Sequence, residues 1–147
     1  MLTDTHFPPD RLDLEITEGY LMRRPEAARD VLRRLKSMGV TIALDDFGTG
    51  FASIGYLKRL GFDSIKIDRS FVAAAGSTSK AVDLARAIVA IGDALELPVT
   101  AEGVESLDQA APMTSAGCVR LQGWLFGRPM TLAQASASFA AQLRLVD

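Results

Sequence analysis

The stretch Val40-Thr-Ile-Ala-Leu-Asp45 determines how we interpret the fold. Successive residues of a β-strand face opposite sides, so Val40, Ile42 and Leu44 share one apolar face. Asp45 falls on the other face, at the carboxyl end of the predicted strand. Four further segments show the same arrangement of one apolar face and an opposite face with a polar residue near its end. They are Arg11–Thr17, Phe62–Asp68, Pro98–Glu102 and Cys118–Gln122.

Segments with a helical period follow each of these strands. Pro25 suits the first turn of a helix that runs to Met38, and Gly39 ends it. Strand and helix therefore alternate five times, which predicts parallel strands joined by right-handed crossovers. The remaining helices are predicted over Ser53–Leu60, Ser77–Leu95, Ser106–Ala116 with a break near Pro112, and from a cap at Thr131 to Leu143.

Two architectures fit this alternation of elements. In an open doubly wound sheet, helices cover both faces, so both faces of every strand should be apolar. A barrel interior tolerates polar residues in its top layer, where the active sites of such barrels lie. The strand pattern therefore favours α/β architecture as a partial (βα)8 TIM-like barrel of about five βα units, in a single domain over residues 1–147.

The composition is that of an ordinary globular protein, with 48% hydrophobic and 23% charged residues. A net charge of −2 gives no basic field for a nucleic acid polymer. Cys118 is the single cysteine, so no disulfide forms within the chain, and we expect it to be a small core residue. No apolar run reaches the roughly 18 residues of a membrane span, and no secretory signal is visible, so we expect a cytoplasmic protein.

Polar residues at the predicted strand ends form one constellation. Carboxylates that converge repel one another unless a cation lies among them, and hard oxygen ligands suit Mg²⁺ or Mn²⁺. A lysine in such a group can orient a water or stabilise an anionic phosphate. The pattern predicts metal-assisted hydrolysis of a phosphoester, although each residue alone would be typical of a helix cap or a surface charge. The set is Glu15, Asp45, Lys66, Asp68, Glu102 and Gln122, with Asp46 where the chain turns out of its strand.

Four residues just beyond the strands carry weaker predictions. Glu18 and Glu105 follow their strands and are expected to be solvated. Trp124 and Phe126 are expected to be buried loop anchors, with a base-stacking surface as the alternative.

Five strings of residues resemble the signatures of the EAL domain family, in matching order and spacing. The resemblance extends over roughly residues 12–143. The strings are Leu14-Glu-Ile-Thr-Glu18, Asp45-Asp-Phe-Gly-Thr-Gly50, Lys66-Ile-Asp68, Ala101-Glu-Gly-Val-Glu105 and Gln122-Gly-Trp-Leu-Phe126.

The resemblance implies a barrel that hydrolyses cyclic-di-GMP to linear pGpG with Mg²⁺ or Mn²⁺. By this resemblance, the metal ligands are Glu15, Asp45, Asp46 and Glu102, and Lys66 activates or positions the attacking water together with Glu102. Asp68, Gln122 and Phe126 line the substrate pocket. The resemblance also implies that the loop from Phe47 to Phe51, with Gly48, Thr49 and Gly50, couples dimerisation to metal binding. Glu18 would brace this loop, and Glu105 would take part in the same coupling. The implied homodimer forms through the Asp46–Phe51 region.

Several features of the family pattern are not found in this sequence. In the family an earlier strand carries a Glu-x-Leu motif whose glutamate binds metal, next to a substrate-binding arginine, and another strand supplies an asparagine ligand. A (βα)8 barrel typically needs roughly 250 residues. We therefore expect the C-terminal portion of an EAL domain that is weakly active or inactive by itself. The alternative is a non-catalytic module that binds cyclic-di-GMP or another protein.

Overall fold

The structure is a computed structural model, and it describes residues 5–50, 54–76 and 78–143. Within this part of the chain, five strands form one sheet in the order β1-β2-β3-β4-β5, and every neighbouring pair is parallel. The strands are β1 (Asp13–Thr17), β2 (Thr41–Phe47), β3 (Ser64–Ile67), β4 (Val99–Ala101) and β5 (Arg120–Leu121).

The helices follow the strands in chain order. A short 3-10 helix, η1 (Pro9–Arg11), precedes β1. The α-helices are α2 (Glu18–Arg23), α3 (Pro25–Ser37), α4 (Ile54–Leu60), α5 (Arg69–Ala75), α6 (Ser79–Leu95), α7 (Leu107–Ala116) and α8 (Leu132–Leu143). None of the helices in the described part of the chain has the length and apolar character needed to cross a bilayer.

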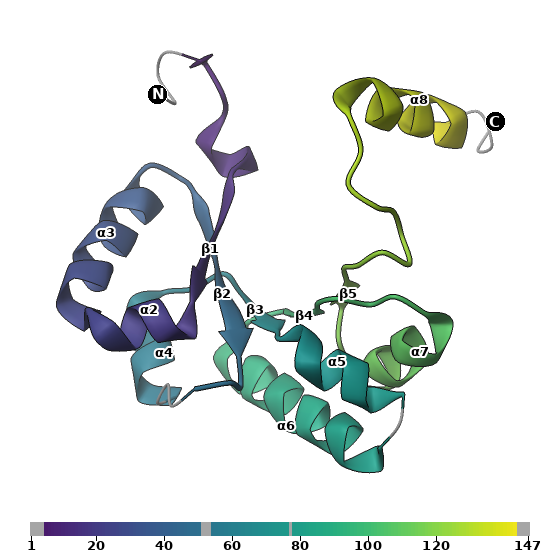
Figure 1. Cartoon of the computed structure of the whole chain (residues 1–147). Coiled ribbons are helices and arrows are strands. Elements are labelled where there is room, and N and C mark those ends of the chain that lie inside the picture. Colours follow the sequence, from purple (N-terminus) through teal and green to yellow (C-terminus); the bar gives the residue numbers. More distant parts are fainter. Residues whose placement is uncertain (1–4, 51–53, 77, 144–147) are drawn as a thin grey trace.

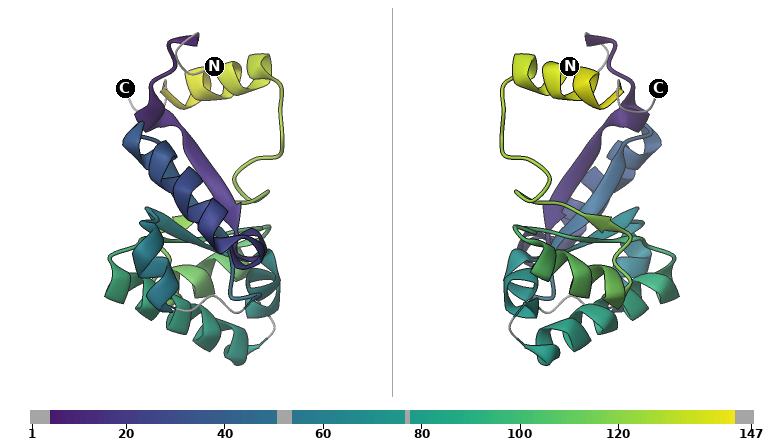
Figure 2. Two further views of the ribbon diagram at one scale, coloured as in Figure 1. Left: turned by 90° about the vertical axis from the view of Figure 1, so that its left-hand side faces the viewer. Right: turned by 90° about the vertical axis from the view of Figure 1, so that its right-hand side faces the viewer.

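The consecutive strand order identifies the architecture. A doubly wound sheet reverses its strand order at a switch point, and no reversal occurs among these five strands. Figure 1 shows the sheet curving, with α3, α4, α6 and α7 all on its outer side. In both views of Figure 2, α8 (yellow) lies far from α6 and α7, beyond an extended segment. These features confirm the predicted partial TIM-like barrel of about five βα units.

The hydrophobic core lies between the outer face of the sheet and the helices. Leu44, Ile65 and Ala101 are completely buried, which agrees with the predicted apolar faces of their strands. Leu32 of α3 and Met113 of α7 belong to the same buried cluster. Burying a side chain of this size contributes about 1.5–3 kcal/mol, so the outer face holds the sheet together. The inner face is therefore free to carry polar groups.

Helices α2 and α5 were not predicted, and α6 begins at Ser79 rather than at Ser77, which lies outside the described residues. A capping signal for α5 is present in the sequence, because the amide of Ser70 donates to Oδ1 of Asp68 over 3.0 Å. The predicted break at Pro112 is wrong. Helix α7 continues through Pro112 because Met113 and its neighbours on one face pack into the core.

The fifth strand is shorter than the predicted segment Cys118–Gln122, because only Arg120 and Leu121 pair with β4. Cys118 is buried at the start of this segment, as predicted for a core residue.

We predict that Cys118 resists alkylation in the folded protein. Burial raises the pKa of Cys118 to about 11, so at pH 8 the thiol stays protonated, whereas the thiolate is the reactive form. Iodoacetamide labelling, followed by mass spectrometry, should be slow in buffer and should accelerate once urea unfolds the chain. Rapid labelling without denaturant would contradict the buried position.

Candidate metal and substrate site

A β-bulge in β2 places two consecutive aspartates at the carboxyl end of the sheet. Leu44 pairs with Ile65 and Phe47 pairs with Ile67, so two residues of β2 lie opposite the single residue between them in β3. Asp46, the second of the two, has a left-handed φ of 56°. The expectation that the strand ends at Asp45 is therefore wrong, since the bulge lets β2 continue for two more residues.

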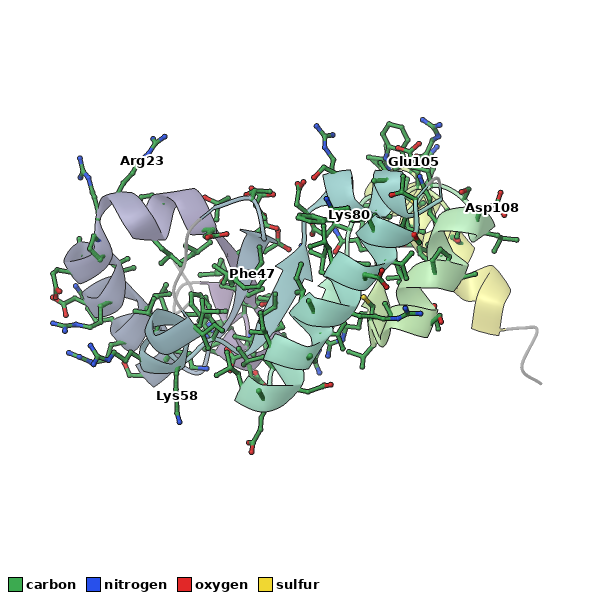
Figure 3. All side chains as sticks on the ribbon, turned by 90° about the horizontal axis from the view of Figure 1, so that it is seen from below. Arg23, Phe47, Lys58, Lys80, Glu105 and Asp108 are labelled. Carbon is green, nitrogen blue, oxygen red and sulfur yellow. The ribbon has the colours of Figure 1, made fainter. Side chains whose placement is uncertain are left out.

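The bulge also explains the positions of the residues around it. Because it inserts one extra residue, Phe47 returns to the apolar side and is buried between the sheet and the helices (Figure 3). The amide of Asp46 donates to Oδ1 of Asp45 over 2.9 Å. Burial raises the pKa of Asp46, and repulsion from Asp45 and Asp68 raises it further. The two carboxylates therefore lie in a region that already has excess negative charge.

Lys66 of β3 is a buried cation at the centre of the site. Its ammonium group forms ion pairs with Glu15 from β1 and with Glu102, which follows β4. Burial lowers the pKa of Lys66, but hydrogen bonds to Glu102 and Glu15 outweigh this effect, so the net shift is upward. Lys66 is therefore held in its charged form, and its two partners come from opposite sides of β3.

Three carboxylates surround this lysine closely enough to share a cation. One oxygen from each of Glu15, Asp45 and Glu102 lies within 4.8 Å of the others. Burial raises the pKa of Glu102; Lys66 lowers it, and Asp45 and Glu15 raise it again. A single lysine cannot neutralise three carboxylates, so the group has the hard oxygen donors and the negative charge that suit a divalent cation.

Two of the substrate residues expected from the sequence, Asp68 and Gln122, lie near residues of this cluster. Burial raises the pKa of Asp68, but hydrogen bonds from Ser70 and the backbone, together with the charge of Arg69, lower it overall. Gln122 and Glu102 line one cavity of about 780 Å³, which extends to Arg69, Glu105, Trp124 and Arg128.

The expectation that Trp124 and Phe126 are buried is wrong, because they are 51% and 61% exposed. Both residues lie in a turn directly after β5, in which the amide of Phe126 donates to the carbonyl of Gly123 over 3.1 Å, and the extended segment begins only after this turn. The guanidinium of Arg128 lies 4.3 Å from the ring centre of Trp124 and partly covers it. No role is predicted for Arg69 or Arg128 from the sequence, because neither belongs to the alternating pattern of a strand.

Glu18 lies at the start of α2, buried against the loop that follows β2. Only 2% of Glu18 is exposed, so the expectation of a solvated side chain is wrong. Its Oε2 accepts hydrogen bonds from the amides of Gly48 and Gly50, over 3.3 and 3.2 Å. A Cβ on Gly50 would lie 2.7 Å from Oε1 of Glu18, so the loop passes too close for a side chain.

The remaining loop residues lie in different places. The hydroxyl of Thr49 donates to the carbonyl of Asp46 over 2.8 Å. Phe51 lies outside the described residues. Glu105 is exposed near the start of α7, well separated from Phe47 (Figure 3).

The family model of the EAL domain matches residues 1–129 of the chain. Over 132 residues the chain is 46% identical to the bifunctional diguanylate cyclase/cyclic di-GMP phosphodiesterase MucR of Pseudomonas aeruginosa, an alignment that covers 90% of this chain and 19% of MucR. The chain spans less than a fifth of the length of the first curated relatives that it matches.

Solved structures match the fold as well. The PaMucR phosphodiesterase in complex with c-di-GMP is 44% identical, with a TM-score of 0.86 over 91% of this chain and 54% of that chain. A manganese and c-di-GMP complex of Klebsiella pneumoniae BlrP1 is 32% identical, with a TM-score of 0.80 over 87% of this chain and 33% of that chain.

We predict that Glu18→Gln loosens the loop at Gly48 and Gly50. The neutral amide oxygen of glutamine accepts from Gly48 and Gly50 more weakly than the charged Oε2 does, which costs about 1 kcal/mol. Urea unfolding should show this loss, and limited proteolysis should show faster cleavage near the loop. Glu26→Gln on the exposed surface of α3 is the matched control and should change neither measurement.

Proposed function

The chain belongs to the EAL domain family, and we propose that it carries the metal and substrate centre of a cyclic-di-GMP phosphodiesterase. The observation that carries this proposal is the buried Lys66 of β3, which pairs with Glu15 of β1 on one side and with Glu102 after β4 on the other. The similarity to the PaMucR phosphodiesterase and to BlrP1, both solved in complex with c-di-GMP, supports the same substrate.

The proposed metal is Mg²⁺ or Mn²⁺. Glu15, Asp45 and Glu102 would hold it, with Asp46 serving a second ion, because the bulge brings that carboxylate to the same end of the sheet. The manganese complex of BlrP1 supports this choice of chemistry. When bound, the cation would supply Lewis acid polarisation of the phosphodiester.

Separate side chains would position the attacking water and bind the substrate. Lys66 stays protonated, so its ammonium group positions the attacking water and stabilises the charge on the phosphate. Asp68, Gln122 and Phe126 would contact the substrate beside the cluster, where Gln122 lines the cavity next to Glu102. Hydrolysis of one phosphodiester bond opens the cyclic dinucleotide to linear pGpG.

We also infer that the chain forms a homodimer through the Asp46–Phe51 region. Support for this part of the proposal comes from Glu18, whose carboxylate holds the loop amides of Gly48 and Gly50. The loop begins directly after Asp46, so a change in its position would move a proposed metal ligand. In this way dimerisation would affect metal binding.

Substitution of Asp45 tests the metal site. Asp45→Asn removes one charge from the cluster, so we expect the affinity for Mn²⁺ to fall by about tenfold or more, which corresponds to about 1.4 kcal/mol. Isothermal calorimetry with Mn²⁺ alone measures this, and Asp83→Asn on the exposed surface of α6 should bind like the parent chain. Equal affinity in Asp45→Asn and the parent would place the metal elsewhere.

We predict that the 147-residue polypeptide, by itself, produces pGpG slowly or not at all. Glu15 lies on β1, at the edge of the five-stranded sheet, and its side chain is 48% exposed, so the cluster is open on that side. Chromatography of pGpG formed from cyclic-di-GMP with Mn²⁺ measures the rate, and Lys66→Met should abolish any turnover. Robust turnover by the parent chain would show that no further ligands are required.

A further inference from the structure

The loop after β4 touches the start of α5 at a glycine. Gly103 follows Glu102 directly and has a left-handed φ of +67°. A Cβ at this position would lie 2.6 Å from Cβ of Arg69 and 3.5 Å from its Cα. The first of these distances is shorter than non-bonded carbon atoms allow, so the two loops meet at a spacing that only glycine permits.

At a second glycine, Gly123, the loop after β5 closely contacts the loop after β4. A Cβ on Gly123 would lie 2.2 Å from the carbonyl oxygen of Val104 and 2.3 Å from its nitrogen. Around this contact the amide of Val104 donates to the carbonyl of Gln122, and the amide of Leu125 donates to the carbonyl of Val104, both over 3.0 Å. Val104 is completely buried, so its backbone cannot move aside.

Each of these contacts is adjacent in the chain to a residue of the proposed site. Gly103 is bonded to Glu102, Gly123 to Gln122, and Arg69 to Asp68. The amide of Glu102 also donates to the carbonyl of Ile67 at the end of β3, over 3.3 Å. The loops after three consecutive strands are thus locked to one another by backbone contacts.

We propose that Gly103 and Gly123 are positioning residues that fix the spacing of Asp68, Glu102 and Gln122. Neither glycine has a side chain with which to bind a ligand, so each acts through the residue before it. The inference rests on the proposed function for the meaning of that spacing. It adds a requirement beyond the presence of the polar residues: the loops after β3, β4 and β5 must keep their close contacts at Gly103 and Gly123.

Gly61 provides a matched control for Gly103. Its φ is +69°, almost the same as that of Gly103, but a Cβ there would meet no atom within 4 Å. It precedes β3 and therefore lies at the opposite end of the sheet from the site. Gly61→Ala and Gly103→Ala introduce the same backbone strain, and only the second pushes a loop away.

Amide hydrogen exchange by NMR tests the contact without reference to any ligand. In Gly123→Ala, the amides of Val104 and Leu125 should exchange at least about tenfold faster than in the parent, because their hydrogen bonds span the contact. In Gly61→Ala they should keep the parent rates after correction for any change in global stability. Parent rates in Gly123→Ala would overturn the proposal.

Mn²⁺ affinity, measured by calorimetry, tests the positioning. Gly103→Ala should bind Mn²⁺ at least about tenfold more weakly than Gly61→Ala when both are measured well below their melting temperatures. Arg69→Gly removes the atom that Gly103→Ala would strike, so the double variant should recover the affinity of Arg69→Gly alone. A merely structural role would lower the melting temperature of Gly103→Ala and leave its affinity equal to that of Gly61→Ala.

The outcomes separate this inference from the proposed function. If the parent chain binds no Mn²⁺, the proposed function fails, and the exchange rates of Val104 and Leu125 still decide whether the loops are locked. If the parent binds Mn²⁺ and Gly103→Ala binds it equally well, the positioning role fails. If Gly103→Ala does not fold, restoration of folding by Arg69→Gly supports the contact, and continued failure to fold overturns it.

Discussion

The arrangement of this domain depends on one buried cation among converging carboxylates. Lys66 lies on the central strand of the sheet and binds Glu15 and Glu102, which come from elements on either side of it. A parallel sheet brings the carboxyl ends of its strands together, and without a positive charge the acids at those ends would repel one another. The outer face supplies the stability that allows this polar inner face.

The bulge in β2 meets two demands at one position. Two adjacent acids, Asp45 and Asp46, lie at the end of the inner face, and Phe47 immediately after them is buried in the core. A regular strand would place Asp46 on the apolar side and Phe47 on the polar side. The inserted residue resolves this conflict, and the loop beyond it is then held by the buried carboxylate of Glu18.

Sequence periodicity predicted much of the fold and the sides on which the polar residues lie. Alternation within strands placed Glu15, Lys66 and Glu102 on one face, because that property depends on backbone geometry alone. It could not predict the bulge, which breaks the alternation, or the burial of Glu18, which depends on a loop 30 residues further along the chain. The close contacts of Gly103 and Gly123 also could not be predicted, because the sequence around a loop glycine does not show which backbone segment packs against it.

The left-handed backbone of Asp46 limits which residues could occupy this position over evolutionary time. Branched side chains such as valine and threonine are excluded by their own sterics, whereas asparagine and glycine adopt this conformation readily. The left-handed backbone and the proposed metal ligation therefore both restrict the residue at position 46. Drift toward asparagine would preserve the bulge and remove the charge, so a descendant could lose the proposed metal ligand while retaining an intact fold.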